Sequence, residues 1–321
     1  MSKLKKEVIS LVVPCYNEEE NISLFYNELQ KTMKFMKEVE FEIVYVNDGS
    51  KDNTLDEMRK LSSLDKRVRY ISFSRNFGKE AAMYAGLVSA TGDYVTIMDV
   101  DLQDPPYLLE QMYNSIKNEG YDCVAAKSVS RHGYSFIRKT LTKWYYSLVS
   151  KVAKVEMVHG ARDYRLMKRK MVDAILELKE YNRYTKGLFS YVGFDTKWIE
   201  YENTERIAGE TKFTIRKLII YGLEGIVGFS TGPLLIAAII GMLFCLLSAV
   251  GVVFIVVRTL IWGDPVGGWP SLVCIMMFLS GIQLFCTGIM GQYLAKTYLE
   301  TKNRPVYIIK ETEKDKIEGK K

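Results

Sequence analysis

The sequence of 321 residues predicts an α/β domain built on a mostly parallel sheet and followed by two long apolar helices. Four short apolar runs are separated by helical segments in the first hundred residues, an order typical of a parallel sheet with helices on both faces. Three of these runs end in polar motifs. Two later stretches, 232–257 and 269–295, contain no charged residue, and each is long enough to cross a bilayer core of roughly 30 Å.

The first strand is expected at 8–13, where a β-branched, apolar run stops at Pro14. Asn17 and the acidic residues after it provide a cap and first-turn acids for a helix that runs to about Met36. The same reasoning predicts strands at 41–46, 68–73, 94–98 and 121–126, a helix from Asp52 and a helix at 80–90.

Segments with apolar and basic residues precede the predicted spans. Apolar and aromatic side chains recur at helical spacing over 136–152, a pattern that fits an interfacial helix and equally a helix packed in a domain core. The stretch 212–229 runs directly into the first span, so we expect an interfacial helix there. The predicted division is 1–211 for the α/β domain, 212–230 for the interfacial helix, 231–296 for two spans (about 232–258 and 269–295) and 297–321 for a cytosolic tail.

Basic residues flank the outer ends of both spans, whereas the link between them is nearly uncharged. The positive-inside rule therefore places the α/β domain and both termini in the cytoplasm of a cell-membrane protein with two spans. Arg258 is the one charge on the opposite side, from where its long side chain can reach the headgroups. In the tail, 305–309 is expected to form an edge strand.

Composition excludes some other classes. The net charge of +6, from 44 Lys and Arg against 38 Asp and Glu, is too modest to call for nucleic acid, and the basic clusters near the spans favour the bilayer as partner. The five cysteines have no paired spacing, so we expect reduced packing residues and no zinc site.

Two carboxylates one residue apart follow the strand at 94–98. Asp99 and Asp101 can converge on one divalent ion, because residues i and i+2 of an extended backbone project to the same side. Oxygen ligands suit Mg²⁺ or Mn²⁺, which keep positions open for phosphate oxygens. The alternative is that both are solvated turn residues. The polar motifs after Pro14 and Val46 end neighbouring strands, where ligands of parallel sheets bind, and this favours a nucleotide site.

Four motifs together resemble the family 2 glycosyltransferases, and within them the polyprenyl-phosphate glycosyltransferases of the dolichol-phosphate mannose synthase and GtrB type. The motifs are Val13-Pro14-Cys15-Tyr16-Asn17-Glu18, Val46-Asn47-Asp48-Gly49-Ser50-Lys51-Asp52, Asp99-Val100-Asp101-Leu102-Gln103-Asp104-Pro105-Pro106 and Arg206-Ile207-Ala208-Gly209-Glu210-Thr211-Lys212-Phe213. The resemblance implies a GT-A fold and inverting transfer from a nucleotide sugar to polyprenyl phosphate. UDP-glucose or a UDP-N-acetylhexosamine is the expected donor, and undecaprenyl phosphate is the expected acceptor in cell-envelope glycosylation.

The resemblance also implies roles for individual residues. Asp101 and Gln103 are expected to hold the metal, and Asp163 is expected to orient the acceptor or assist as a base, with a helix cap from Tyr164 as its alternative role. The expected nucleotide-binding residues are Pro14, Tyr16, Glu18, Val46, Asp48, Asp99, Val100 and Asp101. The expected phosphate-binding residues are Lys127, Arg131, Arg138, Arg206 and Lys212. Asp104 is expected to cap the helix after Pro105.

Two other interpretations are weaker. A processive polysaccharide synthase would carry a Gln-x-x-Arg-Trp motif, and none of the four tryptophans follows an arginine. An inactive membrane scaffold or lipid-transport component would not need the intact carboxylate motif, and the spans contain no charged residue before Arg258 to mark a translocation path. The resemblance also implies a homo-oligomer, such as a tetramer, formed through the membrane segments. Glycines at 281, 288 and 291 permit the close helix packing that this requires.

Overall fold

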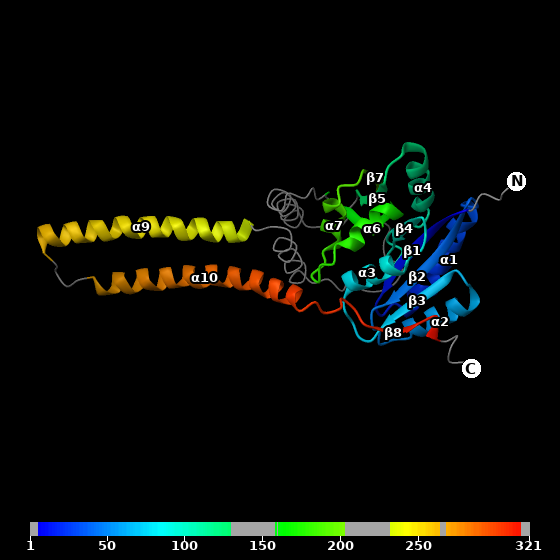
Figure 1. Cartoon of the computed structure of the whole chain (residues 1–321), viewed down its shortest axis with the longest axis horizontal. Coiled ribbons are helices and arrows are strands. Elements are labelled where there is room, and N and C mark those ends of the chain that lie inside the picture. Colours follow the sequence, from blue (N-terminus) through cyan, green and yellow to red (C-terminus); the bar gives the residue numbers. More distant parts are fainter. Residues whose placement is uncertain (1–5, 130–157, 159, 203–231, 264–267, 316–321) are drawn as a thin grey trace.

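The computed structural model describes residues 6–129, 158, 160–202, 232–263 and 268–315. One eight-stranded sheet forms the centre of the α/β domain (Figure 1). Its strands are β1 (Glu7–Cys15), β2 (Val39–Asn47), β3 (Val68–Phe73), β4 (Tyr94–Ile97), β5 (Cys123–Ser128), β6 (Ala161–Lys168), β7 (Thr196–Tyr201) and β8 (Ile309–Thr312).

The strand order is β7-β5-β6-β4-β1-β2-β3-β8. The four strands expected first in the chain, β1 to β4, pair in parallel, and β7 is parallel to β5. Two strands run the other way, because β6 is antiparallel to β4 and β5, and β8 is antiparallel to β3. The predicted mostly parallel sheet is therefore confirmed.

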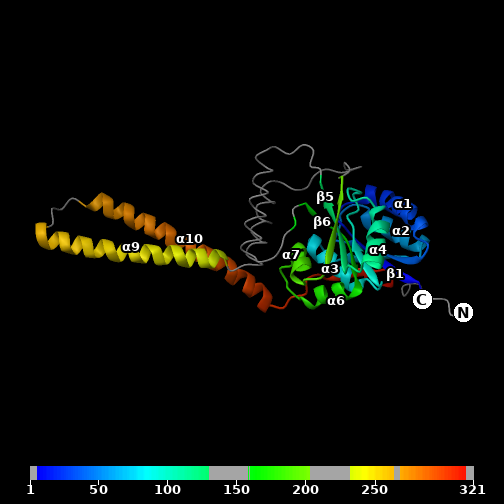
Figure 2. The same cartoon turned by 90° about the horizontal axis from the view of Figure 1, so that it is seen from above.

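Helices cover both faces of the sheet (Figure 2). One face carries α1 (Glu19–Phe35), α2 (Thr54–Leu64) and α4 (Leu108–Glu119). The other carries α3 (Lys79–Ser89), α6 (Arg169–Glu177) and α7 (Thr185–Tyr191). The positions expected for the early strands and helices agree with these bounds to within two residues.

The side-chain alternation of β1 explains the two-sided core. Leu11 and Val13 are buried against the helices of the first face, whereas Val12 between them is buried with α3. α3 lies so close to β1 that a Cβ on Gly86 would be 2.1 Å from a methyl carbon of Val12. A glycine at this position therefore sets the separation between α3 and the sheet.

Two long helices, α9 (Gly232–Trp262) and α10 (Trp269–Thr301), extend side by side from the α/β domain (Figures 1 and 2). Phe244 and Phe278 pack edge to face between them, with ring centroids 5.6 Å apart. Both begin where the spans were predicted. In the described parts of the chain, however, no helix has the length and hydropathy needed to cross a membrane. The interfacial helices expected at 136–152 and 212–229 lie outside the described residues.

After α10 the chain returns to the sheet and adds β8 beside β3. The edge strand was expected at 305–309 and begins four residues later. Acidic side chains in β8 and just after it form ion pairs with the neighbouring elements: Arg59 of α2 contacts Glu311, and Arg69 of β3 contacts Glu313 at 2.9 Å. Tyr70 also donates a hydrogen bond to Glu311 at 2.7 Å. The segment that follows the two long helices is thereby fastened to the α/β domain.

Candidate active site

The loops after β1 and β2 are joined to each other at the carboxyl edge of the sheet. The Asn17 N–H donates to Ser50 Oγ at 3.0 Å, and the Lys51 N–H donates to Asn17 Oδ1 at 2.9 Å. The Glu18 N–H donates to Thr54 Oγ1 at 2.8 Å. Asn17 has a φ of 53°, a left-handed conformation that asparagine tolerates better than most residues. These bonds make the two loops one pre-formed surface.

The residues predicted to bind the nucleotide are divided between this surface and the core. Tyr16 and Glu18 are half-buried at the edge, and Asn21 donates to Glu18 Oε2 at 2.7 Å. The side chains of Pro14, Val46 and Val100 are buried, the two valines in the core clusters. Any contact of these three positions with a nucleotide would have to come from the backbone.

Asp48, also predicted to bind the nucleotide, organises the loop after β3. Its Oδ1 accepts a hydrogen bond from the Phe77 N–H at 2.6 Å, and its Oδ2 accepts one from the Gly78 N–H at 2.9 Å. The residue is only 3% exposed, and burial raises the pKa of its carboxyl, although the two backbone donors oppose this rise. The Asp48 carboxylate thus fixes the turn that leads into α3.

The pairing of β4 with β6 brings together Asp99, predicted to bind the nucleotide, and Asp163, predicted to orient the acceptor or assist as a base. Ile97 pairs with Arg165 in the antiparallel register, and continuing that register by two residues sets Asp99 opposite Asp163. Lys79, the first residue of α3, lies between them. Its Nζ is 2.7 Å from Asp99 Oδ1 and 2.9 Å from Asp163 Oδ2. The alternative role considered for Asp163, as the cap of a helix from Tyr164, is wrong, because the residue lies inside β6.

The charges of Lys79 and of the neighbouring carboxylates shift one another's pKa values. Burial alone would raise the pKa of Asp163, but Lys79 and Lys186 outweigh it and hold that pKa well below the ordinary carboxyl value. Burial correspondingly lowers the pKa of Lys79, but the two carboxylates outweigh it and raise that pKa. Asp163 is therefore an anion and Lys79 a cation across the physiological pH range.

Asp101 and Gln103 lie half-buried on the loop that follows β4. The Gln103 N–H donates to Asp101 Oδ1 at 3.2 Å, and Leu102 between them has a φ of 55°, which is strained for a bulky residue. A carboxylate and an amide oxygen suit Mg²⁺ or Mn²⁺, ions bound through few protein ligands together with substrate phosphates. The described residues contain no group of three or more His, Cys, Asp or Glu side chains that could hold a metal by themselves.

Asp104 does not cap α4, contrary to prediction. α4 begins at Leu108 without any side-chain cap, and Asp104 is buried, with 3% of the residue exposed. Tyr201 at the end of β7 donates a hydrogen bond to its carboxylate, and Arg162 Nε lies 3.7 Å from its Oδ1. Burial raises the pKa of Asp104 to about 6, and Arg162 opposes the rise. The loop that carries Asp101 and Gln103 is thus fastened to β6 and β7.

Of the predicted phosphate-binding residues, the structure describes Lys127 alone. Its Nζ forms an ion pair with Glu200 on the neighbouring strand β7 at 2.9 Å. An acceptor phosphate would have to compete with that carboxylate. Arg131, Arg138, Arg206 and Lys212 lie outside the described residues.

Comparison with known proteins shows which family the chain belongs to. The sequence matches the family model for glycosyl transferase family 2 over residues 10–176. It is also 42% identical over 310 residues to an Escherichia coli (strain K12) protein named prophage bactoprenol glucosyl transferase homolog. That match covers 95% of this chain and 99% of the relative. The chain is a family 2 glycosyltransferase.

One further relative and one solved structure illustrate the range of these similarities. The bactoprenol glucosyl transferase of Shigella phage SfII is 42% identical to this glycosyltransferase over 308 residues, covering 95% of this chain and 98% of the relative. Among solved structures, glucosyl-3-phosphoglycerate synthase from Mycobacterium tuberculosis, in complex with Mn²⁺, UDP-glucose and phosphoglyceric acid, is similar with a TM-score of 0.47 at 19% identity. That similarity covers 69% of this chain and 78% of the other.

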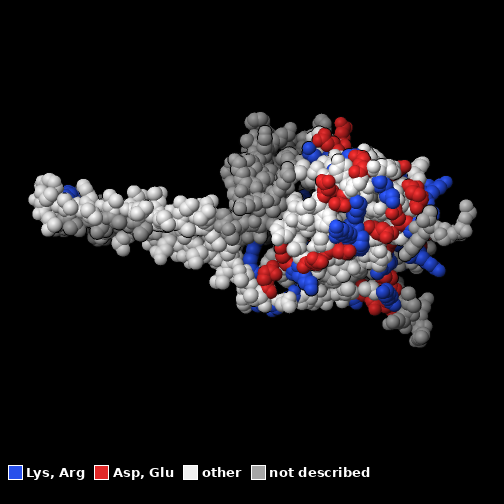
Figure 3. Space-filling model, turned by 45° about the horizontal axis from the view of Figure 1, so that its top comes forward, with Lys and Arg blue, Asp and Glu red and all other residues white. Residues whose placement is uncertain are grey.

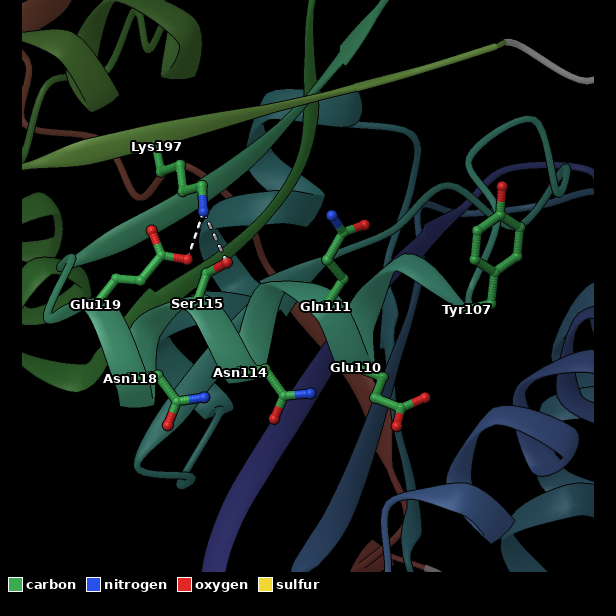
Figure 4. Close-up of a pocket in the computed structure, with 8 residues that line it drawn as sticks. All are labelled: Tyr107, Glu110, Gln111, Asn114, Ser115, Asn118, Glu119 and Lys197. Atoms are coloured by element: carbon green, nitrogen blue, oxygen red, sulfur yellow. Dashed lines mark hydrogen bonds and ion pairs between the residues drawn. The ribbon is translucent and has the colours of Figure 1, made fainter.

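The glycosyltransferase also has a pocket of about 440 Å³ on the outer side of α4 (Figure 4). It is lined by α4, by Tyr107 before it and by Lys197 of β7. Lys197 forms an ion pair with Glu119 at 2.5 Å and donates to Ser115 at 3.2 Å. None of the predicted site residues lines this pocket, so we do not assign it to the transfer reaction.

The sequence-based prediction omitted Arg162 and Tyr201, and it gave Lys79, together with Gly78, only a place in the lining of the donor site. The contact of Lys79 with carboxylates had a signal in the sequence, because a lysine in the first turn of a helix opposes the helix dipole and needs nearby anions. Tyr201 and Arg162 carry none, since their contacts with Asp104 depend on the pairing of strands far apart in the sequence.

Proposed function

We propose that this family 2 glycosyltransferase transfers a sugar from a UDP-sugar to undecaprenyl phosphate or a similar polyprenyl phosphate, with inversion at the anomeric carbon. Glucose is the sugar that we propose. The proposal is supported by full-length relatives named bactoprenol glucosyl transferases. It is carried by one structural observation, the convergence of Asp99 and Asp163 beside the Asp101 loop at the carboxyl edge of the sheet. The product would be a polyprenyl-phosphate sugar for cell-envelope glycosylation.

The proposed step needs no strong base. An anionic oxygen of the acceptor phosphate forms a bond to the anomeric carbon while the bond from that carbon to the diphosphate oxygen breaks. The electron pair leaves with the nucleoside diphosphate, and no proton has to move. The chain must therefore supply position and positive charge, which are the main contributions in reactions of this kind.

The donor is proposed to lie on the surface formed by the loops after β1 and β2, with Tyr16, Glu18 and Asp99 toward its nucleotide. Asp101 and Gln103 would hold Mg²⁺ or Mn²⁺, which when bound offsets negative charge on the diphosphate. Lys127, Arg131, Arg138, Arg206 and Lys212 are the proposed contacts to phosphate groups of acceptor and donor, with Lys127 first released from Glu200.

We further propose that α9 and α10 anchor the enzyme in the cell membrane as two spans, with the α/β domain and both termini in the cytoplasm. Support comes from the stretches 232–257 of α9 and 269–295 of α10, which contain no charged residue, and from large apolar side chains that are more than half exposed, such as Leu235, Phe254 and Phe285. On the face drawn in Figure 3, the helical arm is nearly free of charge, whereas the α/β domain carries both signs. Apolar surface of this extent favours lipid as its surroundings.

A homo-oligomer, such as a tetramer, is part of the same proposal. A Cβ at Gly281, Gly288 or Gly291 of α10 would meet no atom within 4 Å, so α9 does not require these glycines. They remain available for close packing against another copy. Crosslinking of the detergent-solubilised protein should give species larger than a dimer, and recovery of monomer alone would contradict this part.

The transfer itself is tested with purified protein, undecaprenyl phosphate, Mn²⁺ or Mg²⁺ and a panel of UDP-glucose, UDP-N-acetylglucosamine and GDP-mannose. Mass spectrometry should detect a glycolipid, with UDP-glucose as the best donor. A product from another donor would correct the sugar and keep the reaction. Absence of product with every donor, together with no lipid-dependent nucleotide release, would overturn the proposal in favour of a scaffold.

A further inference from the structure

Lys79 occupies a position in the site that helix electrostatics disfavours. It is the first residue of α3, after Gly78, which has a φ of 98°. The N-terminal end of a helix carries partial positive charge, so a cation in the first turn costs stability unless anions offset it. Here two carboxylates supply the offset, Asp99 at 2.7 Å and Asp163 at 2.9 Å.

The two carboxylates come from different elements, a loop and a strand, and Lys79 contacts both. Asp99 follows β4 on the loop that also carries Asp101, whereas Asp163 lies in β6. Without a cation between them, two carboxylates on opposing positions of neighbouring strands would repel each other. The ammonium group of Lys79 therefore holds the loop that carries Asp99 and Asp101 at a fixed distance from β6, the strand that carries Asp163.

Asp163 depends on this ion pair more than an ordinary surface carboxylate does. Its side chain is 15% exposed, and its Oδ1 is buried without a hydrogen-bond partner among the described residues. A buried carboxylate with one unpartnered oxygen is costly to maintain as an anion, so it depends on nearby cations and especially on the group in direct contact with Oδ2. That group is Lys79.

We propose that Lys79 is a positioning residue of the transfer reaction, which holds Asp163 as a fixed anion toward the transferred sugar and in register with the Asp99–Gln103 loop. This inference rests on the proposed function. In it, Asp163 acts by charge and position on the partly positive sugar ring that forms as the diphosphate leaves, and not as a proton acceptor. Such a role needs an accurately placed anion, which the ion pair with Lys79 provides.

The test measures kcat and the KM for the UDP-sugar separately in Lys79→Met. We expect kcat to fall about 100-fold, the size of effect that a small misplacement of reacting groups produces. The KM should change less than about threefold, because the nucleotide surface is built from the loops after β1 and β2. Lys79→Arg keeps the cation and should recover most of kcat. Lys170→Met, an exposed lysine in the first turn of α6, is the matched control.

A double variant shows whether Lys79 acts through Asp163. If it does, Lys79→Met combined with Asp163→Asn should be no slower than the slower single variant, whereas independent roles would multiply the two losses. UDP affinity and thermal unfolding of each variant check that the site is folded, and the double variant, which removes both charges, remains informative if Lys79→Met alone unfolds.

Wild-type protein that makes no glycolipid would refute the proposed function. Active wild type with a Lys79→Met kcat within about threefold of it, or with multiplicative losses in the double variant, would refute the role of Lys79 alone.

Discussion

The carboxylate of Glu300, in the last turn of α10, accepts hydrogen bonds from the backbone N–H of Tyr181 at 3.0 and 3.1 Å. The Asn182 N–H adds a third contact at 3.2 Å. This loop leads into α7, where the Thr185 N–H donates to Glu80 at 2.9 Å, one residue after Lys79. The end of α10 is thereby connected, through the loop before α7, to the start of α3 next to Lys79.

Replacing Glu300 by alanine should loosen that connection. The two backbone donors lose their acceptor, so we expect amide hydrogen exchange over residues 181–185 to become about tenfold faster, in keeping with the loss of roughly 1 kcal/mol per hydrogen bond. Hydrogen-exchange mass spectrometry measures this directly. Glu177→Ala, an exposed residue of α6, is the control, and equal exchange in both variants would show that Glu300 does not hold the loop.

Asp65 should make the free energy of unfolding depend on pH in the acidic range. Arg67 lowers the pKa of Asp65 to about 2, against the opposing effect of burial, and Tyr26 donates a further hydrogen bond at 2.8 Å. A carboxyl whose folded pKa lies below its unfolded value stabilises the protein above about pH 4, and this contribution disappears as the pH falls toward 2. Asp65→Asn should therefore lower the free energy of unfolding at pH 7 by about 1–2 kcal/mol, after allowance for screening of the exposed Arg67.

Denaturant titrations of both proteins at several pH values check this prediction. The stability difference should shrink between pH 4 and pH 2. A difference that stays constant over that range would mean that the ionised carboxylate is not its source.

Gly49 should not tolerate a side chain, because its φ is positive and because the backbone of another loop lies close to it. Gly120 shares only the positive φ, so comparing the two glycines distinguishes these causes. The φ of Gly49 is 64°, and a Cβ there would lie 2.4 Å from the carbonyl carbon of Arg75. Gly120, after α4, has a φ of 85° but no atom within 4 Å of such a Cβ. We expect Gly120→Ala to cost about 1 kcal/mol of unfolding free energy from backbone strain alone. Gly49→Ala should cost roughly 2–4 kcal/mol and also weaken UDP binding.

Thermal unfolding and UDP titration measure these effects. Similar losses for the two alanine variants would show that the close approach of the Gly49 and Arg75 loops does not matter.

Local patterns sufficed for the elements that are buried on both faces. The apolar runs of β1, β2 and β3 and the polar motifs after β1, β2 and β4 could be located because parallel strands read as continuous apolar segments. β6 escaped this reasoning, since Arg165 interrupts its apolar residues. The guanidinium of Arg165 is buried in the fold, 3.5 Å from the ring centroid of Phe189, a contact that no local pattern indicates.

The helix cap predicted for Asp104 and the helix cap considered as the alternative for Asp163 are wrong for the same reason. A carboxylate next to a predicted helix start is most simply a cap, which is why this role was given to both. In the structure each is held by a residue distant in sequence, Tyr201 for Asp104 and Lys79 for Asp163. Tertiary pairing of β4 with β6, and of β5 with β7, decides these contacts.

The most direct test of the central claim compares glucose transfer from UDP-glucose to undecaprenyl phosphate by the wild type, by Asp101→Ala and by Asp56→Ala, an exposed carboxylate on α2. Asp101→Ala should lose at least about 100-fold in rate, because the proposed metal loses its carboxylate ligand, while Asp56→Ala should match the wild type. Transfer by Asp101→Ala at the wild-type rate, or none by the wild type, would contradict the account.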